Sequence, residues 1–293
     1  MAFIFSIFSL YPHLFVLYLK AERMIFMIID THVHIGTGLG FHMTEEDVLY
    51  SLDKYNIDYA LISNTEVASH DHERKLIPSE FQKGQIECLT RALKFARENE
   101  DKIGVLHWVK PMEEITSELK NLIEANLDII KGIKFHPYHA GCAFTSPECK
   151  KYIDLAAEYN LPVVSHTGTG FDDNPKRLFE MAQHYPETPF VMVHLGLGSD
   201  NKEAIELCAQ RENLYGDTTW VSTASALEFI SKCGDDRLLF GSDSPIDGKD
   251  TYLNNGKGDR SLYQEYFNEF KTQVSKETYE KIMYKNAEKL FKI

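Results

Sequence analysis

The chain carries at residues 28–34 the stretch Ile28-Ile29-Asp30-Thr31-His32-Val33-His34, an apolar run rich in β-branched residues that ends in two histidines. A short apolar run of this kind is typical of a strand buried on both faces of a parallel sheet. Four further apolar runs also end in histidine or aspartate: Ile133-Lys134-Phe135-His136, Val163-Val164-Ser165-His166, Val191-Met192-Val193-His194 and Leu239-Phe240-Gly241-Ser242-Asp243. Because parallel strands end at one edge of their sheet, we expect these polar side chains to converge.

Short apolar runs alternate with longer stretches of helical periodicity from Met24 onward, which predicts repeated strand–helix units. The expected strands are residues 25–34, 59–64, 103–109, 132–136, 162–166, 190–194, 214–218 and 238–242. The expected helices are residues 44–55, 81–99, 113–125, 147–159, 175–184, 202–210 and 222–233, followed by a helical region over 262–291. Ser146 before Pro147 and Asn174 before Pro175 are predicted to cap two of these helices.

Strict alternation of eight strands with eight helical regions predicts an α/β fold closed into a (β/α)₈ TIM barrel, forming a single domain over residues 24–293. An open doubly wound sheet is the alternative. It has less support, because no glycine-rich dinucleotide or phosphate motif follows any expected strand.

The composition narrows the classes of partner. The 293 residues are 43% hydrophobic and 26% charged, as in an ordinary globular protein. With 31 basic and 44 acidic residues, the net charge of −13 would repel a phosphate backbone. We therefore expect a small-molecule substrate and no nucleic acid, and we leave a homodimer open.

The five cysteines are odd in number and never form a C-x-x-C pair, which disfavours a disulfide framework or a structural zinc knuckle. We interpret them as reduced thiols of a cytoplasmic protein. Residues 1–23 form an apolar extension that could be a membrane anchor or a secretory signal. Pro12 and His13 interrupt it, and the first base, Lys20, follows the apolar run instead of preceding it. We favour a translation start at Met24 or Met27, and expect no membrane association unless the extension is a genuine anchor.

His32 and His34 lie two residues apart on an extended chain, so their side chains leave the same face and can hold one ion together. Imidazoles from other strands and one carboxylate would complete a site that suits zinc, with manganese, iron and nickel left open. A metal in such a site lowers the pKa of bound water to about 7 and polarises a carbonyl group, which is hydrolase chemistry.

A single histidine at a strand end is more often a hydrogen-bonded structural residue than a ligand. We assign to that structural group the histidines His13, His70, His72, His107 and His184. His42 and His139, on expected rim loops, are left open as substrate contacts. Several buried strands that end independently in imidazole are harder to explain structurally, so the set favours a metal site.

Together these segments resemble the amidohydrolase superfamily, specifically the amidohydrolase-2 group of lactonases, other hydrolases and decarboxylases of the aminocarboxymuconate-semialdehyde type. The stretch from Asp30 to His34 is similar to the D-x-H-x-H motif of that group's first strand. The segments 132–137 and 241–245 resemble its fourth- and eighth-strand motifs, and 286–291 resembles its closing helix. The resemblance extends from Met27 to the C-terminus.

The resemblance implies that His32, His34, His166 and Asp243 ligate the metal, and that Asp243 also accepts a proton from the attacking water. It implies that His194 orients or polarises the substrate, or ligates a second metal.

The resemblance leaves two roles open for Lys134 in the fourth strand. Lys134 is either carboxylated and bridges two metals, or acts on the substrate beside His136, which is assigned to substrate binding. We therefore expect one divalent metal per chain, or two. Asp30 is expected to support the ligands.

The leading functional prediction is metal-dependent hydrolysis of a C–N or C–O bond in a small amide, lactone or ester. The alternative is non-oxidative decarboxylation of an aromatic or unsaturated carboxylic acid at the same site. Arg74 and Arg260 are loop candidates for holding a substrate carboxylate. A barrel without catalysis is disfavoured, because every member of the implied ligand set is present.

Overall fold

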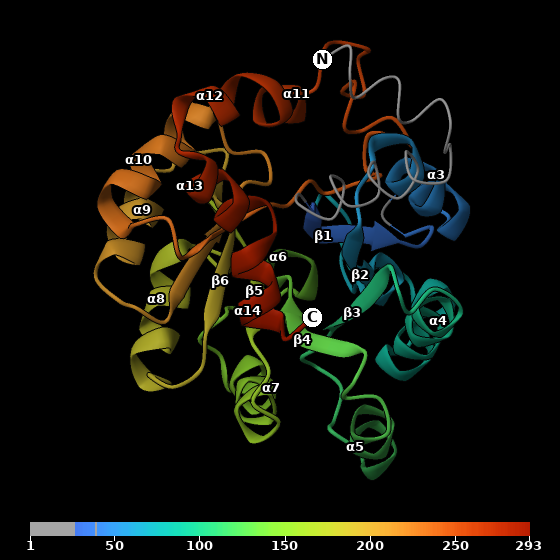
Figure 1. Ribbon diagram of the computed structural model, residues 1–293. Helices are drawn as coiled ribbons and strands as arrows, with labels where there is room; N and C mark the ends of the chain where they lie inside the picture. Colours follow the sequence, from blue (N-terminus) through green and yellow to red (C-terminus); the bar gives the residue numbers. More distant parts are fainter. Residues whose placement is uncertain (1–26, 39) are drawn as a thin grey trace.

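The computed structural model describes residues 27–38 and 40–293 and shows eight parallel strands in the order β1 to β8 (Figure 1). Each strand pairs with the next one along the chain. The strands are β1 (Ile29–Ile35), β2 (Tyr59–Asn64), β3 (Ile103–Trp108), β4 (Ile130–Phe135), β5 (Val163–Gly168), β6 (Phe190–Leu197), β7 (Leu214–Asp217) and β8 (Leu238–Leu239).

The segment that follows β8 joins the last strand to the first. Asp243 N donates to His32 O over 2.8 Å, and His34 N donates to Ser244 O over 2.8 Å. These bonds close the sheet beside β1, and they bring the predicted ligands of the first and eighth strands together. The predicted (β/α)₈ barrel is thereby confirmed.

Helices connect the strands and surround them (Figure 1). They are α3 (Glu45–Tyr55), α4 (Gln85–Glu98), α5 (Ser117–Glu124), α7 (Pro147–Glu158), α8 (Pro175–His184), α9 (Lys202–Ala209) and α10 (Thr223–Cys233). The two predicted caps are confirmed: the Ser146 side chain accepts from Cys149 N at the start of α7, and the Asn174 side chain accepts from Lys176 N at the start of α8.

Apart from shifts of up to four residues at element ends and two short 3₁₀ helices, the structure departs from the predicted elements in three places. The strand expected over 238–242 ends at Leu239, because Ser242 N turns to donate to the Asp30 carboxylate. A short helix, α6 (Pro137–Ala140), follows β4 and was not predicted. The helical region expected over 262–291 is broken before α13 (Lys276–Glu280), where the Ser275 side chain caps a new helix.

The C-terminal helical region consists of several pieces. The first three are α11 (Tyr263–Glu265), the π-helical segment η3 (Tyr266–Phe270) and α12 (Lys271–Gln273). After α13 come a second π-helical segment, η4 (Lys281–Lys285), and α14 (Asn286–Phe291). The short 3₁₀ helices η1 (Thr65–Val67) and η2 (Ser79–Phe81) lie between β2 and α4.

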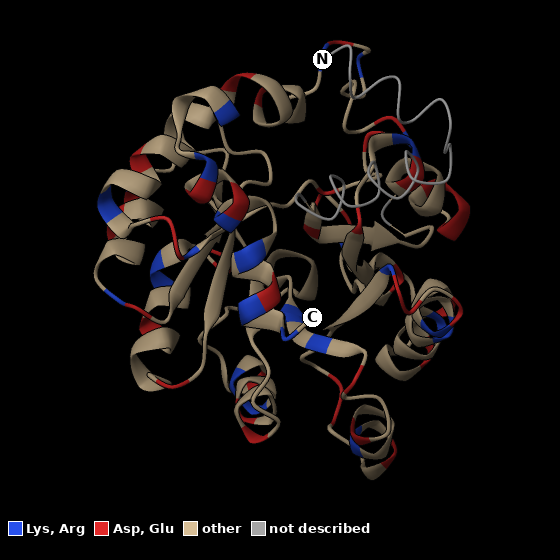
Figure 2. Ribbon diagram, viewed as in Figure 1, with Lys and Arg blue, Asp and Glu red and all other residues tan. Residues whose placement is uncertain are grey.

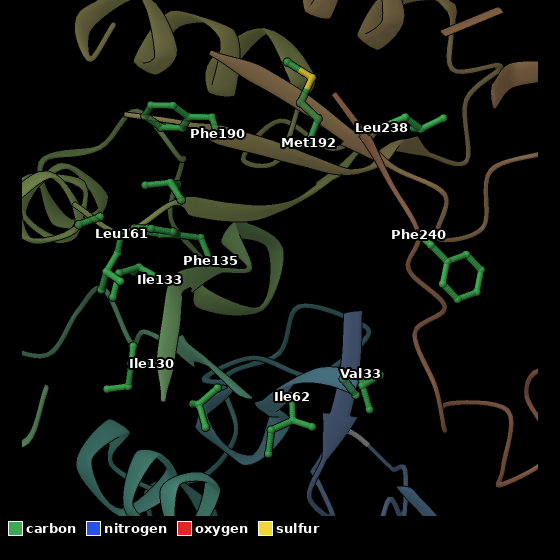
Figure 3. Close-up of a cluster of buried hydrophobic side chains, with 14 of the residues drawn as sticks. Val33, Ile62, Ile130, Ile133, Phe135, Leu161, Phe190, Met192, Leu238 and Phe240 are labelled. Carbon is green, nitrogen blue, oxygen red and sulfur yellow. The ribbon is translucent and has the colours of Figure 1, made fainter. Parts of the chain in front are cut away.

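The hydrophobic core consists mainly of two clusters of buried side chains. The larger cluster packs strand side chains such as Ile62, Ile133 and Phe190 against the surrounding helices (Figure 3). The smaller one joins strand side chains, including Ile29, to Ala287, Leu290 and Phe291 of α14. Burial of these apolar surfaces holds the strands in place, so that the polar residues at their carboxyl ends are fixed on a rigid frame.

Charged side chains lie mainly on the helices and connecting loops (Figure 2). All five cysteines are free thiols. Within the described ranges, we find no helix with the length and apolar character needed to cross a bilayer. The predictions about residues 1–23, and the first residues of the strand expected from 25, fall outside the described part of the chain.

Candidate functional site

A pocket with a cavity volume of about 360 Å³ opens at the carboxyl ends of the strands. It collects six of the predicted site residues: His32, His34, His136, His166, His194 and Asp243. Its wall is completed by Phe41, Met43, Thr65, His72, Trp108, Tyr138, His139, Gly168, Thr169, Gly170, Asp173, Leu197 and Ile246. The strand-end residues that are far apart in the sequence therefore face one space.

Three of the four predicted ligands form a compact cluster, which we call the three-residue cluster: His32, His34 and Asp243. The two histidine Nε2 atoms are 3.0 Å apart. Asp243 Oδ1 lies 3.1 Å from Nε2 of His32 and 2.9 Å from Nε2 of His34. All three residues are buried, and one ligand atom from each lies within 4.8 Å of the others.

Hydrogen bonds behind the rings decide which nitrogens face the cluster. Nδ1 of His32 lies 3.3 Å from the Asp217 carboxylate, and Nδ1 of His34 lies 2.9 Å from Ser63 Oγ and 3.4 Å from Ser63 O. A carboxylate only accepts, so Nδ1 of His32 carries the proton and its Nε2 presents a lone pair, and the Ser63 carbonyl favours the same tautomer for His34. In this arrangement two lone pairs and a carboxylate oxygen converge, which suits a cation.

His166 stands beside this cluster without being part of it. Its Nε2 lies 3.3 Å from Asp173 Oδ2, so Nδ1 is the ring nitrogen left for another partner. The Asp173 carboxylate fits here because its neighbours are glycines: a Cβ on Gly168 or Gly170 would come within 2.7 or 2.5 Å of its oxygens. Asp173 Oδ1 is buried without a hydrogen-bond partner.

His194 lies within β6, with its ring centroid 5.2 Å from that of His32 and 4.8 Å from that of His166. Its Nδ1 is 3.1 Å from Thr219 O, which leaves Nε2 as an acceptor in the neutral ring. Burial holds the pKa of His194 well below its ordinary value. Its φ of 67° is left-handed, a conformation that costs about 1–3 kcal/mol in a residue other than glycine.

Asp243 is oriented from behind by Trp220. Trp220 Nε1 donates to Asp243 Oδ2 over 2.8 Å, while Oδ1 faces the two histidines. Burial opposes ionisation of the carboxyl group, but His32 and His34 hold its pKa well below the usual range. Asp243 and Trp220 also have left-handed φ values, 66° and 57°. Backbone strain of this kind is concentrated at functional sites.

Lys134 lies at the base of the site and is fully buried. Its Nζ is 3.1 Å from Nε2 of His32. Burial lowers the pKa of Lys134 to about 8, against the opposing attraction of Asp217 and Asp243. The amine is then mostly charged at pH 7 with a neutral minority, which is compatible with both roles considered for this residue.

His136 stacks between two rings, at 5.3 Å from Trp108 and 3.9 Å from His166, with interplanar angles of 10° and 12°. The neighbouring rings cover its two faces, so His136 meets the pocket with its edge. Asp30 lies below the rim and accepts from His32 N over 3.0 Å and from Tyr252 OH over 2.7 Å. These bonds tie the first strand to the segment after the eighth.

The sequence interpretation missed several residues of the site: Asp217, Asp173, Trp108, Trp220 and Ser63. His72, assigned to the structural group, lines the pocket, as does His139, whereas His42 is not among the lining residues. The arginine candidates do not reach the site, because Arg74 pairs with Asp172 and Arg260 with Glu269. Asp217 had a signal in the sequence, since it ends the seventh strand.

The donor set fits a divalent metal. Ligands 2.0–2.1 Å from a tetrahedral metal lie roughly 3.3 Å apart, and the three donor atoms of the cluster are 2.9–3.1 Å apart. Imidazole nitrogen and carboxylate oxygen are ligands that zinc and its neighbours in the first transition row accept. The carboxylate behind His32 is a usual partner of a metal-bound histidine.

Fold and site together define a (β/α)₈ barrel with a histidine- and carboxylate-lined pocket at the carboxyl ends of its strands. The family model described as "Amidohydrolase" matches residues 29–293, and the chain belongs to this family of the amidohydrolase superfamily of enzymes. A search of curated protein sequences gives no match.

Several solved structures share the fold. A "probable 2-pyrone-4,6-dicarboxylic acid hydrolase" from Acinetobacter baumannii with citric acid bound is 17% identical, with a TM-score of 0.62 over 91% of this chain and 99% of that one. The 5-carboxyvanillate decarboxylase of Sphingomonas paucimobilis is 12% identical (TM-score 0.67; 92% and 99% covered). The same enzyme from Novosphingobium aromaticivorans, with bound manganese and a substituted benzoic acid, is 13% identical (TM-score 0.66; 92% and 97% covered).

Proposed function

We propose that this protein is a metal-dependent hydrolase that cleaves a C–N or C–O bond in a small amide, lactone or ester. The observation that carries the proposal is the three-residue cluster, in which the lone pairs of His32 and His34 and the carboxylate of Asp243 converge within 4.8 Å at the base of a pocket. His166 is proposed as the fourth ligand through Nδ1. We propose zinc as the metal and the cytoplasm as the location.

When bound, a divalent metal would activate water and polarise the carbonyl group of the substrate. The chain's own groups would handle the protons. Asp243 accepts the proton of the attacking water and returns it to the leaving nitrogen or oxygen as the bond to the carbonyl carbon breaks. Trp220 and the two histidines fix the direction of that carboxylate.

The remaining residues position the substrate. His194 Nε2 is an acceptor in the neutral ring, which favours proton acceptance or ligation of a second metal over polarising a carbonyl group. Lys134 is proposed either as a carboxylated bridge between two metals or as a buried cation beside the substrate. The aromatic rings of Trp108 and His136 line the pocket and can contact an unsaturated or cyclic substrate.

Decarboxylation is the second candidate. It is supported by the fold shared with two carboxyvanillate decarboxylases and by the aromatic residues that line the pocket. In this reaction the donor set would hold an aromatic or unsaturated carboxylic acid, and a side chain of the pocket would deliver a proton to carbon as carbon dioxide leaves.

The experiment that tests the proposal is a substrate panel with two readouts. Protein purified without chelators is offered lactones, amides, esters and hydroxybenzoates, and each reaction is scored for acid release and for carbon dioxide. We expect acid release that Asp243→Asn abolishes without loss of the folded circular-dichroism spectrum. The matched control is Asp236→Asn, at an acid whose side chain is 68% exposed. Carbon dioxide release would replace the hydrolase with the decarboxylase.

A further inference from the structure

Two acidic side chains, Asp173 and Asp243, line the pocket and give its wall negative charge. Among the residues that the structure describes, no lysine or arginine lines this pocket, and the ammonium group of Lys134 contacts His32 beneath the wall. A ligand in the pocket therefore meets two acidic groups, and positive charge reaches it only at the base.

Two arginines near the wall, Arg74 and Arg177, are committed to other partners. Arg74 pairs with Asp172, and its guanidinium lies 5.2 Å from the ring centroid of Tyr138, a lining residue. Arg177 donates to Phe171 O over 2.5 Å and to Thr145 Oγ1 over 2.8 Å. Turning either guanidinium into the pocket would break bonds that it already makes.

The rest of the wall is largely aromatic and apolar. Trp108, Phe41, Leu197 and Ile246 contribute apolar surface. Burial lowers the pKa of His139 to about 4, so this ring is neutral at pH 7. Such a wall suits an aromatic or apolar small molecule.

We propose that the pocket selects aromatic or apolar small molecules with at most one carboxylate and rejects those with two or more. The base of the site can neutralise one carboxylate. A second carboxylate would lose its hydration against the wall without gaining a cation, and it would face Asp173. The inference rests on the proposed function, because it takes this pocket as the place where substrate binds.

The test compares two probes of matched size and shape, isophthalate and 3-carbamoylbenzoate. Both carry one carboxylate on a benzene ring, and they differ only in whether the second substituent is a carboxylate or a neutral amide. Dissociation constants are measured with the metal-loaded protein by calorimetry or by ligand-observed NMR. We expect 3-carbamoylbenzoate to bind at least about tenfold more tightly, since an unpaired buried charge or like-charge contact opposes isophthalate.

A pair of variants then assigns the discrimination to the pocket wall. Leu197→Arg adds a cation at a lining residue that is 40% exposed, whereas Leu127→Arg adds one at a leucine that is 39% exposed and precedes β4, away from the pocket. The first variant should reduce the preference to less than about threefold, because a guanidinium can pair with the second carboxylate. The second variant should leave the preference unchanged.

Isophthalate binding as tight as 3-carbamoylbenzoate binding would overturn the inference, as would failure of both probes to bind, or an equal effect of the two arginine variants. The metal content of the same preparation and its turnover of the substrate panel are recorded separately. Selectivity without turnover would refute only the proposed function. Turnover without selectivity would refute only this inference.

Discussion

Asp217 gives the sharpest test of how the site is built, because it orients His32 from behind without reaching the pocket. Its Oδ1 accepts from His194 N over 2.8 Å and its Oδ2 accepts from Thr219 Oγ1 over 2.8 Å, with His32 Nδ1 at 3.3 Å. In Asp217→Asn, one oxygen becomes an amide NH₂ group that cannot accept. If that NH₂ group faces His32, one alternative is that Nδ1 of His32 loses its hydrogen bond. The other is that the ring proton moves from Nδ1 to Nε2, and Nε2 then has no lone pair to offer the metal.

The magnitude follows from that lost bond. A hydrogen bond to a charged group contributes about 1.5–3 kcal/mol, and every 1.4 kcal/mol is about tenfold in affinity. We therefore expect Asp217→Asn to weaken zinc binding by about 10- to 100-fold, the range usual for partners of metal-bound histidines. The assay is competition of the metal-free protein with a chelator of known zinc affinity.

The control is Asp236→Asn, which removes an exposed carboxylate paired with Lys281 and should bind zinc as the unmodified protein does. Circular dichroism establishes that both variants are folded. Zinc affinity of Asp217→Asn within about twofold of the control would refute the reasoning, because His32 would then need no partner to present Nε2.

Three further changes have defined outcomes. Asp173→Asn removes the carboxylate that lies 3.3 Å from His166 Nε2 and should weaken zinc binding by about tenfold in the same competition assay. Unchanged zinc affinity would contradict the proposal that Asp173 positions His166 as a ligand. Trp220→Phe deletes the donor to Asp243 Oδ2 and should lower zinc affinity by about fivefold; an effect on thermal stability alone would contradict this. Burial lowers the pKa of His107 to about 3. Between pH 3 and 6.5 this histidine is therefore protonated in the unfolded chain but not in the folded chain, and the folded state loses stability as pH falls. Denaturant unfolding of His107→Leu at pH 7 and pH 5 should show this loss reduced by about 2 kcal/mol, and an undiminished loss would place the acid sensitivity elsewhere.

The sequence predicted the barrel because its strands are buried on both faces and read as uninterrupted apolar runs. The site histidines His32, His34, His166 and His194 could be predicted for the same reason, because each follows an apolar run where a buried strand would otherwise have another apolar residue. Asp217 obeys the same rule at the end of β7 and was overlooked, although the expected strand included it.

Other features depend on contacts that no local pattern encodes. β8 is short because Asp30, more than two hundred residues away in the sequence, accepts from Ser242 N. Asp173 reaches His166 from a loop, through space left by Gly168 and Gly170. Trp220 reaches Asp243 from a left-handed turn. Each of these pairings is set by tertiary packing, so periodicity and composition could not predict it.

The central claim is that His32, His34 and Asp243, with His166 beside them, hold a divalent metal. The most direct measurement is the metal content per chain of protein purified without chelators, determined by elemental analysis before and after incubation with zinc or manganese. The account predicts about one tightly bound ion per chain, or two if Lys134 is carboxylated. Protein that is folded, free of metal and unable to take up either ion would contradict it.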